Sequence, residues 1–303
     1  MADLRPRVLL FGELLVDRFP EGDVFGGAPF NVARHLSAFG CAPTLVTRIG
    51  MDQEGGHALQ VLESAGLPTH GVQLDSIYPT GTVAVRFTSS GVHRFDILPN
   101  QAYDHIHPRL ARIAAIATRP QLVYFGTLAQ RSDSHRALRH LLRAATGQRF
   151  LDVNLRSPWL DVPRLHWSLK QADIVKANDA ELDLMGDLLD LGESTAEAKA
   201  ELLMRRYALK GVLITLGPEG AWWLDDGGWI RIASVPVEEL RDTVGAGDAF
   251  SSVFILGLLH RWEVPLTLQR AHRFAGAVCG ILGAVPEHPR FYSPFISEWF
   301  PAG

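Results

Sequence analysis

The stretch DTVGAGDAF, residues 242–250, sets two glycines around Ala246 at the point where an apolar helix is expected to begin. Such a glycine turn leaves the first N–H groups of the helix without intrahelical partners, and with the helix dipole they form a site for an anion. Asp248 falls in the first helical turn, so its carboxylate is expected beside that site. This combination predicts a base that accepts a proton from a hydroxyl attacking a bound phosphate. The alternative is an aspartate that only stabilises the helix N-terminus.

Two familiar phosphate-binding motifs do not account for this stretch. No GxxxxGK[ST] sequence occurs in the chain, which excludes a P-loop. A dinucleotide-binding turn would carry its third glycine at the position of Phe250, so that interpretation is weak. The stretch therefore indicates a glycine-turn anion site of another kind.

Outward from this stretch, short apolar runs alternate along the chain with segments of helical periodicity. Strands are expected at residues 8–12, 44–49, 121–125, 150–153, 173–176 and 212–216. Helices are expected at residues 29–39, 57–65, 134–145, 162–171, 180–189, 195–207, 246–261 and 266–282. This alternation favours an α/β fold in which a mostly parallel sheet is covered on both faces.

Two further segments do not fit such a parallel sheet. Residues 82–88 and 92–98 alternate apolar and polar side chains around a Ser-Ser-Gly turn, which predicts a β-hairpin with one face exposed or placed over a ligand. No linker-like change of composition divides the chain. We therefore expect one domain over residues 1–303, with a small lid formed by about residues 14–26 and 72–100.

The composition is that of an ordinary globular protein. Its 303 residues are 47% apolar and carry a formal charge of −4, from 29 basic and 33 acidic side chains. Because no long basic run occurs, nucleic acid is not expected as a partner. No signal peptide or apolar run of roughly 18 residues occurs, so we expect no membrane association and a cytoplasmic location. Cys41 and Cys279 are expected to be reduced, and the twelve histidines show no compact metal-ligand spacing.

Five motifs, in order along the chain, resemble those of the ribokinase-like (PfkB) carbohydrate kinases. They are Gly12-Glu13 with Asp17, GGAPFNVA at 26–33, ADIVKANDAE at 172–181, TLGPEG at 215–220, and the glycine turn at 242–250. The resemblance spans nearly the whole chain. It implies a ribokinase-like three-layer α/β/α sandwich with a central, mostly parallel sheet and a small β-sheet lid. It also implies transfer of a phosphoryl group from ATP to a sugar.

Within that family, the sequence is similar to the fructokinase-like branch. The form GGAPxN at 26–31 is typical of that branch, and DVNLR at 152–156 is similar to its Asp-Pro-Asn-x-Arg segment. The sequence departs from the branch at Val153, where proline is usual, and at Phe30, where a small residue is common. The resemblance implies phosphorylation of fructose to fructose 6-phosphate. The alternatives are another acceptor (2-keto-3-deoxygluconate, ribose or a nucleoside) or a catalytically inactive regulatory member.

The resemblance also implies roles for the residues that would meet the sugar. Asp248 would be the base for the primary hydroxyl, and the anion hole would be formed by the N–H groups of Gly245, Ala246 and Gly247. The expected sugar-binding residues are Asp17, Gly26, Gly27, Asn31 and Arg156. A surface salt bridge is the alternative for the arginine. The hairpin at 82–98 would add Arg86, Arg94 or Phe95, depending on its register.

A second group of residues is assigned to the nucleotide and to cations. The expected ATP-binding residues are Lys176, Thr215, Gly217, Gly220 and Ala275. Asn178 and Glu181 would position Mg²⁺, through water, and their alternative role is helix capping. Asp242 would help to bind a monovalent cation such as K⁺. The family resemblance further implies a homodimer formed through the lid.

Overall fold

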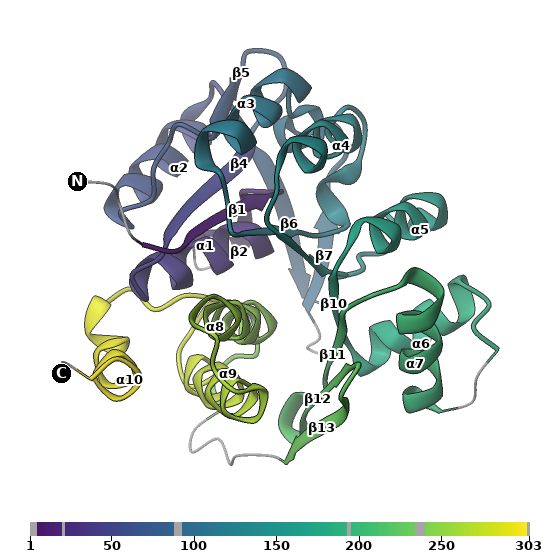
Figure 1. Cartoon of the computed structure of the whole chain (residues 1–303). Helices are drawn as coiled ribbons and strands as arrows, with labels where there is room; N and C mark the ends of the chain where they lie inside the picture. The colour runs from purple at the N-terminus through teal and green to yellow at the C-terminus, as the bar shows by residue number, and fades with distance from the viewer. Residues whose placement is uncertain (1–4, 20–21, 88–92, 193–194, 234–239, 302–303) are drawn as a thin grey trace. The chain divides into compact units, whose positions relative to one another are not determined.

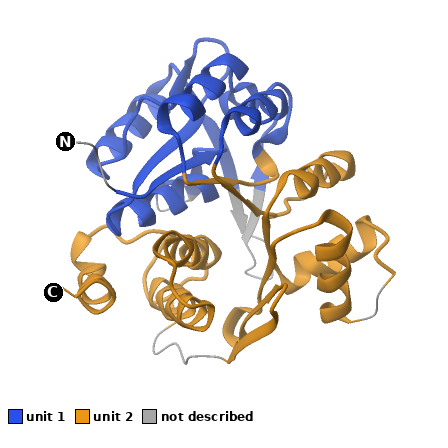
Figure 2. Cartoon of the chain, viewed as in Figure 1, with its two compact units in different colours: residues 1–120, 129–146 blue, residues 121–128, 147–303 orange. Residues whose placement is uncertain are grey.

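The computed structural model describes residues 5–19, 22–87, 93–192, 195–233 and 240–301. Side chains are described for these residues, except for 19, 85–87 and 93–95. The chain divides into two compact units, coloured separately in Figure 2. Unit 1 comprises Met1–Pro120 and Ala129–Thr146, and unit 2 comprises Gln121–Leu128 and Gly147–Gly303. Nine of the described strands belong to one large sheet and four to a separate smaller sheet.

Unit 1 contributes three parallel strands to the large sheet. They are β1 (Arg7–Phe11), β4 (Ala42–Gly50) and β5 (Val72–Asp75), in that order. Its α-helices are α1 (Ala28–Ala38), α2 (Gln53–Ser64), α3 (Pro108–Thr118) and α4 (Ser134–Ala144). Prolines in the first turn start α1 and α3, where a missing N–H does no harm, and the Asp52 side chain caps α2.

The smaller sheet also belongs to unit 1. Its order is β3 (Gly22–Gly26), β2 (Leu15–Phe19), β6 (Gly81–Phe87) and β7 (His93–Ile97). β6 and β7 pair antiparallel, as the alternating sequence pattern predicts. The turn between them and the side chains of Arg86, Arg94 and Phe95 lie outside the described part of the structure.

The predicted lid begins too early in its second segment. Residues 72–75 form β5, which pairs parallel with β4 in the large sheet rather than in the smaller one. The physical reason is a buried carboxylate: Asp75 Oδ2 forms an ion pair with Arg48 Nε on the neighbouring strand at 2.8 Å, and Asp75 Oδ1 accepts the N–H groups of Ile77 and Tyr78. The smaller sheet therefore takes its second segment only from Gly81 onward.

Unit 2 holds the other six strands of the large sheet. Their order is β13 (Gly228–Ala233), β12 (Gly220–Asp225), β11 (Gly211–Thr215), β10 (Ile174–Asn178), β9 (Gln148–Asp152) and β8 (Leu122–Phe125). The run from β8 to β11 is parallel, and the edge hairpin β12–β13 is antiparallel. The parallel strands are almost wholly buried and apolar, so the sequence prediction of a covered parallel sheet is confirmed.

The helices of unit 2 follow its strands along the chain. They are α5 (Val162–Gln171), α6 (Asp179–Leu188), α7 (Ala196–Tyr207), α8 (Ala246–His260), α9 (Val264–Val278) and α10 (Ser293–Trp299). α8 and α9 lie side by side (Figure 1), and α8 is buried along most of its length. Short 3-10 helices occur at Ala102–His105, Leu128–Gln130, Gly217–Glu219 and Pro289–Phe291. No helix in the described part of the chain is both long and apolar enough to cross a membrane.

Candidate active site

The glycine turn before α8 is fixed by backbone hydrogen bonds. Gly245 is the N-cap residue and has a φ of 77°, which a side chain would strain. The two oxygens of Asp242 accept the N–H groups of Val244 and Gly283, each at 3.0 Å. Arg241 and Asp242 both donate their N–H groups to Cys279 O. The start of α8 is therefore anchored to the segment that follows α9.

Two of the three predicted anion-hole N–H groups are available in this turn. Ala246 donates its N–H to Thr243 O at 3.3 Å, so this group already takes part in the turn. Among the described residues, the N–H groups of Gly245 and Gly247 have no hydrogen-bond partner. Both belong to the N-terminus of a 15-residue helix, where the backbone attracts negative charge.

A buried ammonium group lies against the same turn. Lys176 Nζ, on β10, bonds both carboxylate oxygens of Asp152 at 3.1 and 3.2 Å. A Cβ atom placed on Gly247 would lie 3.1 Å from that nitrogen. Burial by itself lowers the pKa of Lys176, but the carboxylates of Asp152, Glu181 and Asp248 outweigh it and raise the pKa above its usual value. The ammonium is therefore charged at neutral pH.

The carboxylate of Asp152 has two further partners inside unit 2. Ser251 Oγ on α8 donates to Oδ2 at 2.9 Å, and Tyr124 Oη on β8 donates to the same oxygen at 3.1 Å. Asp152, Ser251 and Tyr124 are each at most 1% exposed. Sequence reasoning missed Tyr124 and Ser251 and gave Asp152 no role beyond its place in the DVNLR segment, although two signals were present. Asp152 is a charged residue at the end of an apolar strand, and Ser251 follows Asp248 by three residues and so shares its helix face.

The predicted magnesium pair forms a helix cap. Asn178 is the N-cap of α6 and accepts the N–H of Glu181 at 2.7 Å, while Glu181 Oε2 accepts the N–H of Asn178 at 3.0 Å. Glu181 Oε1 accepts the N–H of Leu155 at 3.0 Å. Burial raises the pKa of the Glu181 carboxyl, although the nearby Lys176 ammonium acts in the opposite direction. The capping role that the sequence left as an alternative is thus observed.

Besides Lys176 on β10, the predicted nucleotide residues lie at one end of β11 and on α9. Thr215 ends β11 and pairs in register with Asn178. Gly217 and Gly220 have φ values of 54° and 115°, and a Cβ on Gly220 would come within 2.2 Å of Ile232 O. Ala275 is buried in α9. These residues and the glycine turn all belong to unit 2.

The predicted sugar-binding residues divide between the units. In unit 1, Asp17 Oδ2 lies so close to Gly26 that a Cβ on this glycine would be 2.8 Å away. Gly27, with a φ of 112°, is the N-cap of α1, and Asn31 donates its N–H to Gly27 O. Asp17 lies within β2, next to the strand that ends at Gly26. Arg156, the remaining member, is exposed and belongs to unit 2.

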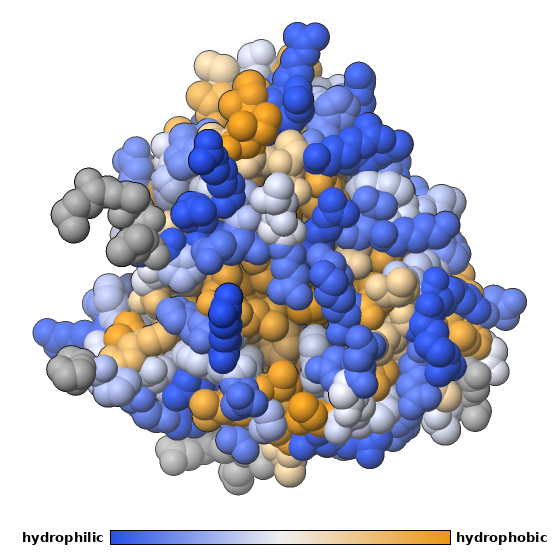
Figure 3. All heavy atoms as spheres, in the orientation of Figure 1, coloured by the Kyte–Doolittle hydropathy of each residue, from blue (hydrophilic) through white to orange (hydrophobic). Residues whose placement is uncertain are grey.

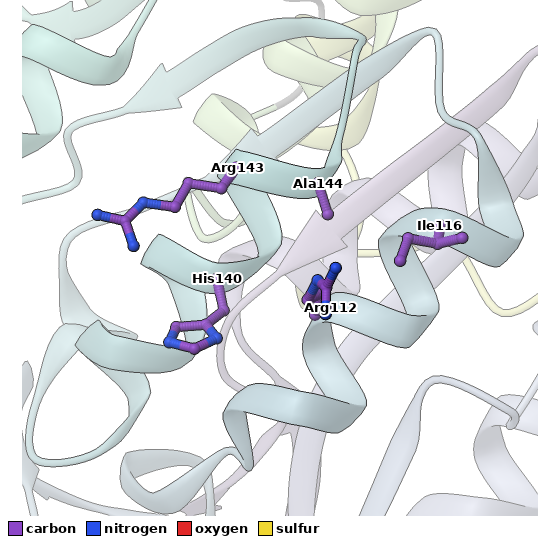
Figure 4. Close-up of a pocket in the computed structure, with 5 residues that line it drawn as sticks. All are labelled: Arg112, Ile116, His140, Arg143 and Ala144. Carbon is purple, nitrogen blue, oxygen red and sulfur yellow. The ribbon is translucent and has the colours of Figure 1, made fainter.

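The described part of the chain has no metal-binding cluster outside the residues discussed above. Within the described ranges, no group of three or more His, Cys, Asp or Glu side chains is arranged to hold a metal ion. A hollow of about 560 Å³ between α3 and α4 is lined by Arg112, Ile116, His140, Arg143 and Ala144 (Figure 4). None of the predicted site residues lines it. On the face shown in Figure 3, hydrophobic residues gather over α3, where Leu110, Ile113 and Ile116 are half exposed.

The sequence matches one family of known proteins over most of its length. Residues 15–289 match the sequence profile of the pfkB family carbohydrate kinases. This chain belongs to that family. It is therefore a sugar kinase, and its large, mostly parallel sheet with a smaller separate sheet is the ribokinase-like fold.

Curated relatives and solved structures agree with this assignment. A Pyrococcus horikoshii protein named as a sugar kinase is 30% identical over 294 residues, which cover 89% of this chain and 87% of that protein. Fructokinase-1 of Zea mays is 27% identical, with 95% and 96% of the two chains covered. Among solved structures, a ribokinase II from E. coli superposes with a TM-score of 0.81 at 22% identity and covers 97% of this chain and 99% of its own.

Proposed function

We propose that this sugar kinase transfers the γ-phosphoryl group of ATP to the primary hydroxyl of fructose, giving fructose 6-phosphate. One observation carries the phosphoryl transfer: the Lys176 ammonium, the Asp248 carboxylate and two N–H groups without a partner among the described residues meet at the first turn of α8. This is the set that such a transfer needs, namely a base and stabilisation of negative charge in a site built before the substrate arrives.

Each group has one task in the proposed reaction. Asp248 accepts the proton of the attacking hydroxyl. The N–H groups of Gly245 and Gly247 and the ammonium of Lys176 stabilise the charge on the phosphoryl group in transfer. On the nucleotide side we propose Thr215, Gly217, Gly220 and Ala275, because the two glycines allow close approach and the site lies in the same unit. In the solved neighbours, a second E. coli ribokinase II structure contains ATP and Mg²⁺.

The residues proposed for cations fit an indirect binding mode. Asn178 Oδ1 and both carboxylate oxygens of Glu181 each accept one hydrogen bond from a backbone N–H group. Each of these oxygens has a second lone pair, which can accept a hydrogen bond from a water molecule bound to Mg²⁺. When bound, Mg²⁺ would neutralise phosphate charge. Asp242, whose carboxylate is held by two backbone N–H groups, is proposed to face a monovalent cation such as K⁺.

The choice of fructose rests on sequence. The GGAPxN and DVNLR segments resemble those of the fructokinase-like branch, and several curated fructokinases of plants match nearly the whole chain. In unit 1, Asp17 and Asn31 are proposed to bind sugar hydroxyls, with Gly26 and Gly27 admitting the sugar close to the backbone. Arg156 is proposed to contact substrate from unit 2.

Two properties of the whole molecule belong to the same proposal. We place the enzyme in the cytoplasm, and we propose a homodimer formed through the smaller sheet, whose edge strands are β3 and β7. Val24 on β3 is 46% exposed, which offers apolar area to a second copy. Analytical ultracentrifugation tests the dimer, with Val24→Asp as the variant expected to be monomeric.

A substrate panel tests the activity and the sugar together. ADP release is measured with ATP and Mg²⁺ over fructose, 2-keto-3-deoxygluconate, ribose and nucleosides. We expect the highest kcat/KM on fructose. We also expect Asp248→Asn to lower kcat by roughly 10²- to 10⁴-fold, because the variant keeps the shape of the side chain but cannot accept the proton.

The outcomes test three parts of the proposal separately: the phosphoryl transfer, the choice of fructose and the role of Asp248 as the base. Turnover on no acceptor would refute phosphoryl transfer, and turnover on another acceptor alone would refute fructose. If Asp248→Asn keeps full activity, the base lies elsewhere.

A further inference from the structure

Four side chains from four separate strands and helices of unit 2 form one buried network. Tyr124 comes from β8, Asp152 from β9, Lys176 from β10 and Ser251 from α8. We propose that Asp152, held by Ser251 and Tyr124, is a positioning residue that fixes the Lys176 ammonium against the first turn of α8, where it stabilises the phosphoryl group in transfer. This role presupposes the reaction proposed above and adds to it a function for Asp152, Ser251 and Tyr124, to which the sequence analysis gave none.

The first observation is that Asp152 has little freedom to move. Its Oδ2 atom receives hydrogen bonds from Ser251, Tyr124 and Lys176 at 2.9, 3.1 and 3.2 Å, and its Oδ1 atom receives one from Lys176 at 3.1 Å. Asp152 and Lys176 are also register partners on adjacent parallel strands, so the backbone aligns them before the side chains meet. The lysine side chain is thereby held in one place.

The second observation is that the ammonium keeps a donor for a ligand. A lysine ammonium has three N–H donors, and the two oxygens of Asp152 are its only hydrogen-bond partners within the described residues, so at least one donor remains. The nitrogen lies beside Gly247, in the glycine turn whose Gly245 and Gly247 N–H groups have no partner among the described residues. The remaining donor is therefore close to the groups that we assign to the phosphoryl group.

The third observation separates this role from simple stabilisation. A buried ion pair contributes little to stability relative to apolar residues of similar volume, because desolvating both charges offsets their attraction. Here Lys176 and Asp152 are 6% and 1% exposed, and the ammonium lies beside Gly247 in the first turn of α8. Gly247 leaves the ammonium its space, since a methyl group there would come within 3.1 Å of it.

A double-mutant cycle on kcat tests the positioning role. We expect Lys176→Met to lower kcat by roughly 10²-fold or more, as removal of one stabilising donor does in other enzymes. We expect Asp152→Asn to lower kcat by roughly 10-fold or more with an unchanged KM for the sugar, because the lysine loses its charged anchor. In the Lys176→Met background, Asp152→Asn should cost no further activity, because Asp152 acts only through the lysine.

A matched serine pair keeps the test valid if the charge variants fold poorly. Ser251→Ala removes a donor to Asp152, whereas Ser252→Ala removes an equally buried hydroxyl that bonds Ala249 O on the same helix. We expect Ser251→Ala to lower kcat a few-fold more than Ser252→Ala, at equal thermal stability.

The outcomes distinguish this inference from the proposed function. Additive effects of Lys176→Met and Asp152→Asn, or equal effects of the two serine variants, would overturn the positioning role while wild-type turnover still supports the kinase. An absence of turnover in the wild type would remove both.

Discussion

Gly247 shows how much of this site depends on the absence of one methyl group. Its φ lies outside the left-handed region, so unlike Gly245 it is not needed for its backbone conformation. It is instead the residue against which the Lys176 ammonium lies. Glycine inside a helix stabilises that helix less than alanine does, by roughly 0.5–1 kcal/mol. Gly247 therefore lowers the stability of α8 but leaves room for the ammonium.

Gly247→Ala should therefore separate activity from stability. We expect kcat to fall by about tenfold, because the methyl group displaces the ammonium by a few tenths of an ångström. The free energy of unfolding should stay equal or rise, by up to about 1 kcal/mol, because alanine favours the helix. Steady-state kinetics and urea denaturation measure the two quantities. A parallel loss of stability would show that the glycine serves the fold instead.

The helix α8 depends on its first turn in a different way. Gly245 needs a positive φ, and it also lies against a neighbouring segment, since a Cβ there would be 2.4 Å from Ala284 Cβ. Asp242 ties this turn to Gly283, which also has a positive φ but has open space where a Cβ would be. The helix α8 is thus positioned by contacts with the segment that follows α9 as well as by its own sequence.

This pair of glycines gives a controlled test of the packing at the start of α8. Gly283→Ala should cost about 1 kcal/mol for the left-handed backbone alone. Gly245→Ala should cost roughly 2–4 kcal/mol, because the clash with Ala284 adds to the same backbone strain. Urea denaturation of both variants checks the difference. Equal costs would mean that the turn moves away from Ala284 without resistance.

Across the whole molecule, both cysteines are packing residues. Cys41 and Cys279 are 1% and 8% exposed. Burial raises the pKa of the Cys41 thiol from 9.0 to about 12, and burial also raises the pKa of Cys279, with a further contribution from the Asp242 carboxylate. Since the thiolate is the reactive form, neither thiol is reactive at neutral pH in the folded chain.

A thiol titration therefore reports on the intact fold. At about pH 8, an aromatic disulfide reagent should label neither cysteine in the native protein within minutes and both in concentrated guanidinium chloride. The pKa of the Cys41 thiol is higher in the folded protein than in the unfolded chain, so the thiol of the unfolded chain ionises first as the pH rises. The free energy of unfolding should therefore fall as the pH rises above 9.0. Rapid labelling of the native protein would contradict the buried positions.

The amino-acid sequence by itself determined the α/β fold class, the family and the identity of the proposed base, because these depend on local periodicity and on motifs contained in short stretches. The glycine turn at 242–250 and the strand–helix alternation are readable without any long-range contact. Only the tertiary structure decided what surrounds the base. Ser251 and Asp152 are 99 residues apart, and Lys176 meets Asp152 through the register of β9 with β10. The hydrogen bond from Leu155 N–H to Glu181 and the place of β5 in the large sheet depended on the same kind of information. The physical reason is that strand register and side-chain pairing are fixed by packing between distant segments, which no local pattern records.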